Sequence, residues 1–128
     1  MSSDPRHPDR ISTAMVMADG LATIYRRWGS GRTVVLLGAS DGVALALGAA
    51  YRVIVPAVPL RFSELGAAGW LCGVYDGLGI AEATIVTTPA LQDAAMSFAQ
   101  DAPDRVKGII IADASTADLR AAVERSFS

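Results

Sequence analysis

Residues 83–115 place two strand-like runs on either side of an amphipathic helix. The first run ends near Val86, and the second, residues 106–112 from Val106 to Ala112, is rich in isoleucine and is predicted to be buried on both faces. Between the runs, apolar side chains recur at helical spacing at Leu91, Ala94, Ala95 and Phe98. Strand, helix and strand in so short a stretch predict a β-α-β unit, and such a unit implies a parallel sheet.

The rest of the chain predicts further strands and helices around this unit. Asp19-Gly20 separates two β-prone segments, residues 13–18 and 21–28, which indicates a tight hairpin. Further strands are predicted at residues 33–37 and 51–56, and helices at residues 43–50, 63–77 and 115–125. We therefore expect one α/β domain at residues 13–128, with a mostly parallel sheet and flanking helices, behind a mobile polar leader at residues 1–12.

The predicted helix that begins at Ser63 or Glu64 carries three glycines on one face. Gly69, Gly73 and Gly77 are four residues apart, and each costs a helix up to about 1 kcal/mol relative to alanine. A glycine face permits another backbone to approach closely. We interpret it as a site of tight packing on a sheet or on another helix, rather than as a membrane-type dimer contact.

Composition and charge exclude several classes of function. The sequence is 52% apolar with a net charge of −2, and it shows no basic patch, so we expect no nucleic-acid partner. It shows neither an apolar run long enough to span a membrane nor a secretory signal, which predicts a cytoplasmic protein without a membrane partner. Cys72 and His7 are the only cysteine and histidine, so we expect no metal site, and we expect no cofactor.

Several short motifs resemble the N-terminal part of the α/β-hydrolase family. The resemblance covers residues 19–115 and rests on four stretches: Tyr-Arg-Arg-Trp-Gly at 25–29, Tyr-Arg-Val-Ile-Val-Pro at 51–56, Asp-Gly-Leu-Gly-Ile at 76–80 and Pro-Asp-Arg-Val at 103–106. It implies an antiparallel hairpin at the N-terminal edge of the sheet. It also implies a cap, two further strands and a catalytic histidine beyond the part that resembles this chain, which would make the chain a truncated α/β-hydrolase-like domain.

The turn after residue 86 differs from the nucleophile elbow of that family. Pro89 stands where the resemblance would place the nucleophilic serine, and Thr87 and Leu91 replace the two elbow glycines. Proline offers no hydroxyl, thiol or carboxylate and cannot act as a nucleophile. The same residues suit an ordinary helix start, with Thr88 as a side-chain N-cap and Pro89 at the first helical position.

The loop from Gly38 to Gly42 has three readings. It is a literal Gly-x-Ser-x-Gly elbow with Ser40 as nucleophile, which would need His7 as its base. It also resembles the start of the dinucleotide-binding loop of short-chain dehydrogenases, with Ala44 in place of the last glycine. Finally, it resembles the oxyanion loop of α/β hydrolases, with Gly38 and Ala39 in place of its first two residues. An ordinary strand-to-helix turn also fits these residues.

These observations favour a catalytically inactive α/β-hydrolase-like domain that acts in binding or assembly, and they assign no catalytic residue. The alternative is a hydrolase of small esters or lactones that uses Ser40 or residues from a partner chain. The resemblance lets Asp113 occupy the place of the acid in some family members. The candidate pocket comprises Gly38, Ala39, Ser40, Asp41, Thr88, Pro89 and Asp113.

The isoleucine-rich strand predicts a homodimer. No further strand is predicted after Ser115, so the strand at 106–112 would leave a row of backbone N–H and C=O groups unpaired. A second copy pairing with it, antiparallel about a two-fold axis, would satisfy them. We expect the apolar face of the last helix either to cover its own strand or to pack on the partner.

Overall fold

The computed structural model describes residues 12–38, 41–59, 61–62, 66–111 and 116–127. Their strands form one six-stranded sheet in the order β1-β2-β4-β3-β5-β6. The strands are β1 (Ser12–Ala18), β2 (Leu21–Trp28), β3 (Thr33–Leu37), β4 (Arg52–Pro56), β5 (Ala83–Thr87) and β6 (Val106–Ile111). The α-helices are α1 (Asp41–Gly48), α2 (Gly66–Leu78), α3 (Gln92–Asp101) and α4 (Thr116–Ser126), with short 3-10 turns η1 (Pro89–Leu91) and η2 (Pro103–Arg105).

The sheet is parallel except at its N-terminal edge. β3 pairs in parallel with β4 and β5, β5 pairs in parallel with β6, and β1 and β2 are antiparallel. The hairpin turn has φ values of 53° at Asp19 and 75° at Gly20. Two positive φ values match the right-handed twist of the flanking strands. The predicted fold class and hairpin are therefore confirmed.

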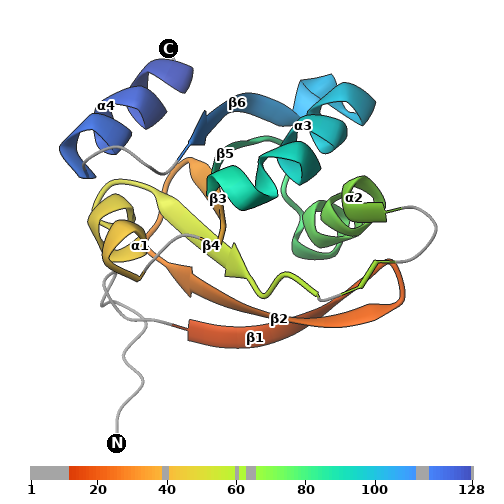
Figure 1. Cartoon of the computed structure of the whole chain (residues 1–128). Helices are drawn as coiled ribbons and strands as arrows, with labels where there is room; N and C mark the ends of the chain where they lie inside the picture. Colours follow the sequence, from red (N-terminus) through yellow and green to blue (C-terminus); the bar gives the residue numbers. More distant parts are fainter. Residues whose placement is uncertain (1–11, 39–40, 60, 63–65, 112–115, 128) are drawn as a thin grey trace, which may run out of the picture.

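Each face of the sheet is covered by two helices, as Figure 1 shows: α1 and α4 on one side, α2 and α3 on the other. On the α2 and α3 side, Leu37, Ile54 and Ile85 pack with Trp70, Tyr75 and other residues of the larger core. A smaller core on the α1 and α4 side joins strand residues to Leu47, Leu119 and Val123. All five residues of β5 are buried, because this strand lies between two paired neighbours and beneath both layers.

The glycines of α2 bring that helix against the edge hairpin. A Cβ on Gly73 would lie 2.8 Å from the backbone N of Asp19 and 2.9 Å from Cα of Ala18, and a Cβ on Gly77 would overlap Val16. These distances are too short for any side chain, so the glycines permit the close approach of helix and strand. The predicted packing of this face on a sheet is confirmed.

Two details of the sequence-based prediction were wrong. The helix predicted from Ser63 or Glu64 is observed from Gly66, whose φ of 70° prevents a right-handed helix from continuing through it; residues 63–65 lie outside the described residues. Strand β6 is only half-buried on average, because it is an edge strand of the described sheet. Of the two placements expected for the last helix, the structure shows the one within its own chain, with Leu119 and Val123 of α4 buried in the smaller core.

The ends of the predicted domain are only partly described. Ser12 begins β1, whereas the remainder of the predicted leader, residues 1–11, lies outside the described residues, as does Ala112 at the end of the predicted edge strand. Among the described helices, none is both long and apolar enough to cross a membrane.

Candidate functional site

The carboxyl ends of the parallel strands bring together the predicted loops. Because Leu37 of β3 is in register with Thr87 of β5, the residues that follow them are neighbours. The backbone N–H of Thr88 donates to the carbonyl of Leu37 at 3.1 Å. A Cβ on Gly38, where φ is 75°, would lie 3.1 Å from Oγ1 of Thr88 and 2.9 Å from Cδ1 of Leu91. The structure therefore places Gly38 beside Thr88, as the candidate pocket requires.

Pro89 opens the 3-10 turn η1 and is exposed to solvent. Thr88 precedes it with extended φ and ψ of −70° and 158°, and the only positive φ at a described residue other than glycine belongs to Asp19. The turn after β5 therefore lacks the backbone strain of a nucleophile elbow. The prediction of Pro89 at an ordinary helix start is confirmed.

The predicted side-chain cap at Thr88 was wrong. Its hydroxyl makes no capping hydrogen bond; instead, its backbone carbonyl accepts from the N–H of Leu91 at 3.1 Å and from Oγ1 of Thr87 at 3.0 Å. Thr88 therefore fixes the turn through its backbone. Proline at the next position already removes one of the N–H groups that a cap would satisfy.

The remaining predicted site residues stay predictions. Ala39, Ser40 and Asp113 lie outside the described residues, and Asp41 begins α1 without a described side chain. Among the residues that the structure does describe, no group of three or more His, Cys, Asp or Glu side chains is placed to hold a metal ion. At this end of the strands, the polar groups that the structure describes around Thr88 are threonine hydroxyls and backbone N–H and C=O groups.

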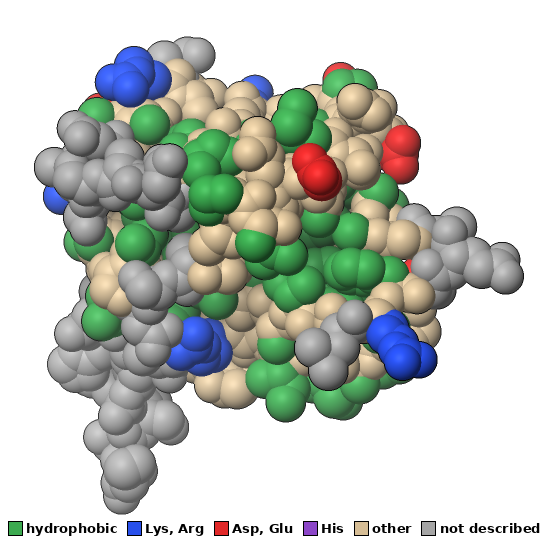
Figure 2. Space-filling model, in the orientation of Figure 1, with side chains coloured by type: hydrophobic (Ala, Val, Ile, Leu, Met, Phe, Trp, Pro, Cys, Tyr) green, Lys and Arg blue, Asp and Glu red, His purple; other side chains and the backbone are tan. Residues whose placement is uncertain are grey.

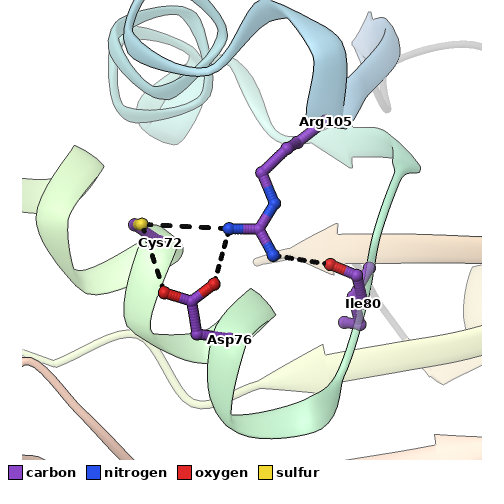
Figure 3. Close-up of polar contacts among 4 residues, drawn as sticks. All are labelled: Cys72, Asp76, Ile80 and Arg105. Carbon is purple, nitrogen blue, oxygen red and sulfur yellow. Dashed lines mark hydrogen bonds and ion pairs between the residues drawn. The ribbon is translucent and has the colours of Figure 1, made fainter.

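At the other end of the parallel strands, where they begin, two of the stretches that resemble the α/β-hydrolase family meet (Figure 3). Arg105, from the Pro-Asp-Arg-Val stretch, donates to Oδ1 of Asp76 at 2.6 Å and to the carbonyl of Ile80 at 2.7 Å. Both partners belong to the Asp-Gly-Leu-Gly-Ile stretch. The guanidinium also lies over the ring of Tyr75, 5.2 Å from its centroid, and 4.0 Å from Sγ of Cys72. Arg105 therefore ties the end of α2 to the start of β6.

The surroundings of this cluster shift the pKa values of two acid groups in opposite directions. The hydrogen bond from Arg105, and then its charge, lower the pKa of Asp76. Burial raises the pKa of the Tyr75 phenol well above its usual range, and the nearby Arg105 offsets only part of that effect. Tyr75 is fully buried beside Phe98 and stays neutral at physiological pH. The cluster is a structural clamp made of one ion pair, one backbone contact and one aromatic face.

Sequence analysis missed a basic pocket at this same edge. Arg32, Arg52 and Lys107 line an open pocket of about 640 Å³, together with Glu82 and Phe127. The three basic residues are far apart in the sequence, so no patch was visible there. A signal did exist, because each stands at or next to the start of a predicted strand, and parallel strands begin at one edge of a sheet.

Comparison with known proteins places the fold. No protein-family model and no curated protein match the sequence. Among solved structures, Cfl2 from Burkholderia cenocepacia is similar with a TM-score of 0.72 and 22% identity, over 88% of this chain and 44% of that one. A meta-cleavage product hydrolase from Pseudomonas fluorescens has a TM-score of 0.66 and 26% identity over 75% and 43%. An epoxide hydrolase from Vigna radiata has a TM-score of 0.68 and 18% identity over 77% and 39%.

The chain has the α/β-hydrolase fold. The antiparallel hairpin, the strand order and the solved structures agree with the motifs on which the resemblance rested. The chain corresponds to the N-terminal part of that fold and spans about two fifths of the length of the structures that it matches, 39% to 44% for the three described above.

Proposed function

We propose that this protein is a non-catalytic α/β-hydrolase-like domain, a pseudoenzyme in its described part, that acts by binding or assembly. The observation that carries the proposal is the turn after β5, where exposed Pro89 begins η1 in unstrained backbone. A serine hydrolase needs a nucleophile there with a base in hydrogen-bond reach. The side chains described around the turn belong to threonine, proline and leucine, and none of these is a general base.

The proposed assembly uses the outer edge of β6. In the described sheet, β6 pairs only with β5, so its other side presents backbone donors and acceptors. Ile109, Ile110 and Ile111 are each half-buried, although α3 and α4 flank the strand. An edge that is long, apolar and unpaired favours pairing with another strand. We propose that a second copy pairs with it, antiparallel about a two-fold axis, to give one continuous sheet.

Sedimentation at micromolar concentration tests the assembly. A dimer is expected for the unmodified chain, and Ile110→Pro should shift it to a monomer, since proline removes a backbone donor within the strand. The matched control is Met15→Pro in β1, the edge strand at the other end of the sheet, which should leave the dimer intact. Circular dichroism establishes that each variant is folded. A monomeric unmodified chain whose β6 amides exchange rapidly with solvent would rule out the proposed dimer.

Serine-directed phosphonates test the absence of catalysis. We expect no stoichiometric labelling of the purified chain, whereas an activated serine would react. Labelling at Ser40, located by peptide mass spectrometry, would instead support a hydrolase of small esters or lactones. Slow turnover of an activated ester alone does not distinguish the two functions, because any exposed nucleophile reacts with such esters.

A further inference from the structure

The basic pocket at the amino ends of the strands is built by residues that the fold, and not the sequence, brings together. Arg32 immediately precedes β3, and Arg52 begins the neighbouring β4, with the N–H of Arg52 donating to the carbonyl of Arg32 at 2.9 Å. Lys107 reaches the same pocket from β6, and Phe127 closes it from the end of α4. Its volume of about 640 Å³ lies within the range of small-molecule sites, roughly 300–1,000 Å³.

The positive charges in the pocket are only partly satisfied. Lys107 forms an ion pair with Glu82 at 3.3 Å. Arg32 is anchored to the wall, because its Nη1 donates to the carbonyl of Phe127 at 2.8 Å and its guanidinium lies 5.2 Å from the centroid of the Phe127 ring. Neither contact neutralises Arg32. The pocket is lined by three basic side chains and by one carboxylate, that of Glu82, so two positive charges are not balanced.

Arg52 is the basic residue of the pocket that carries an unpartnered donor. It is half-buried, and its Nε is fully buried without a hydrogen-bond partner in the described structure. A buried charged donor without a partner is costly. The planar guanidinium can donate two parallel hydrogen bonds to a phosphate or carboxylate group. An oxyanion in the pocket that Arg52 lines would neutralise the charge of this guanidinium.

We propose that this pocket binds a small organic phosphate, with Arg52 and Arg32 holding the phosphate group. Phosphate carries a charge of about −1.5 to −2 at neutral pH, which matches the two unpaired arginines better than a single carboxylate does. The pocket volume leaves room for an organic body beside the phosphate group. The site is at the opposite edge of the sheet from Thr88 and Pro89, so it stands independently of the function proposed above.

Titration with phenyl phosphate and with inorganic phosphate, followed by NMR at constant ionic strength, tests the site. We expect saturable shifts of the amides of Arg32, Arg52 and Lys107, with phenyl phosphate tighter than inorganic phosphate. Arg52→Gln should weaken binding at least about tenfold, the loss expected for a bidentate charged contact. Arg120→Gln, at an exposed residue of α4, is the matched control: it removes one positive charge outside the pocket and should leave binding unchanged.

Equal weakening by Arg52→Gln and Arg120→Gln would overturn the proposal, since binding would then follow net charge alone. Absence of saturable shifts in the unmodified chain would overturn it as well. Thermal unfolding without phosphate provides a separate check. Arg52→Gln should not lower the melting temperature, because the described structure gives Arg52 Nε no partner to lose. A clear drop would show that Arg52 serves the fold, and would contradict the assignment.

Discussion

Arg105 illustrates how one side chain can secure two motifs that are separated in the sequence. Arg105→Gln removes its bonds to Asp76 and to the Ile80 carbonyl, and the second of these acceptors lies in the backbone before β5. We expect a lower free energy of unfolding, mainly from the lost bond to the part-buried Ile80 carbonyl, for which the typical net contribution of a hydrogen bond is about 1 kcal/mol. Urea denaturation measures it, with exposed Arg120→Gln as the control. Equal stabilities of the two variants would contradict the clamp.

The pH dependence of this clamp has a definite sign. Because Arg105 lowers the pKa of Asp76, the folded state favours the ionised carboxylate. The resulting stabilisation is present above the ordinary aspartate pKa and disappears as the pH falls through the lowered one. Asp76→Asn should therefore reduce the melting temperature slightly at neutral pH, and the difference should vanish in acid. A difference that persists at low pH would assign it to packing.

The sequence predicted the chemistry of these residues better than their partners. Asp76 and Arg105 were each singled out within a separate stretch that resembles the α/β-hydrolase family, but nothing in either stretch indicates that they touch. Their contact depends on the turns before β5 and β6 lying side by side. At Thr88 the start of the helix was predicted correctly, but the hydrogen bond was not. The backbone carbonyl of Thr88, and not its hydroxyl, forms the hydrogen bond that fixes the turn.

At the scale of elements, the packing of α2 on β1 depends on Gly73. Gly73→Ala would favour the isolated helix by up to about 1 kcal/mol, yet its Cβ would meet the backbone N of Asp19 at 2.8 Å. Backbone cannot move aside as a side-chain end can, and overpacking costs about 1–3 kcal/mol. We expect net destabilisation in thermal unfolding. Ser97→Ala, on the exposed side of α3, is the control and should change stability little. A stabilised Gly73→Ala variant would show that the helix can shift outward.

Periodicity predicted most elements correctly and their burial less well. Residues 33–37 were predicted as a strand and are β3 without change, since a run of buried β-branched and leucine residues offers little alternative. The isoleucines of β6 are equally apolar, but they lie in an edge strand and are only partly buried. The composition of a strand shows that its side chains are apolar, whereas the position of the strand in the sheet determines how much of them is buried.

At the scale of the whole molecule, features carried by continuous stretches of sequence were predicted, whereas a feature formed by residues far apart in the sequence was not. The family resemblance allowed a mostly parallel sheet with an antiparallel N-terminal hairpin to be predicted, and the structure and the comparisons confirm it. The motifs did not point to the basic pocket, because Arg32, Arg52 and Lys107 come together only when the strands beside them are aligned in the sheet. Figure 2 shows hydrophobic side chains gathered over the middle of the face in view, between α3 and the β1–β2 hairpin.

The last prediction concerns Pro89→Ser, which restores the residue type that the resemblance would place there. A serine at this position would be exposed at the start of η1, in a turn without the strain that presents a nucleophile. It would also need a base within about 2.6–3.2 Å, and the chain has a single histidine, His7, far away in sequence.

We therefore expect the turnover of p-nitrophenyl acetate by Pro89→Ser to equal that of Pro89→Ala, the matched control that also removes the proline ring. Initial rates over a range of substrate concentrations make the comparison. Saturable turnover by the serine variant alone, abolished by a serine-directed phosphonate, would mean that a base stands beside residue 89 after all. The inference that no base lies beside this turn would then have to be withdrawn, although the native chain would still lack a nucleophile at Pro89.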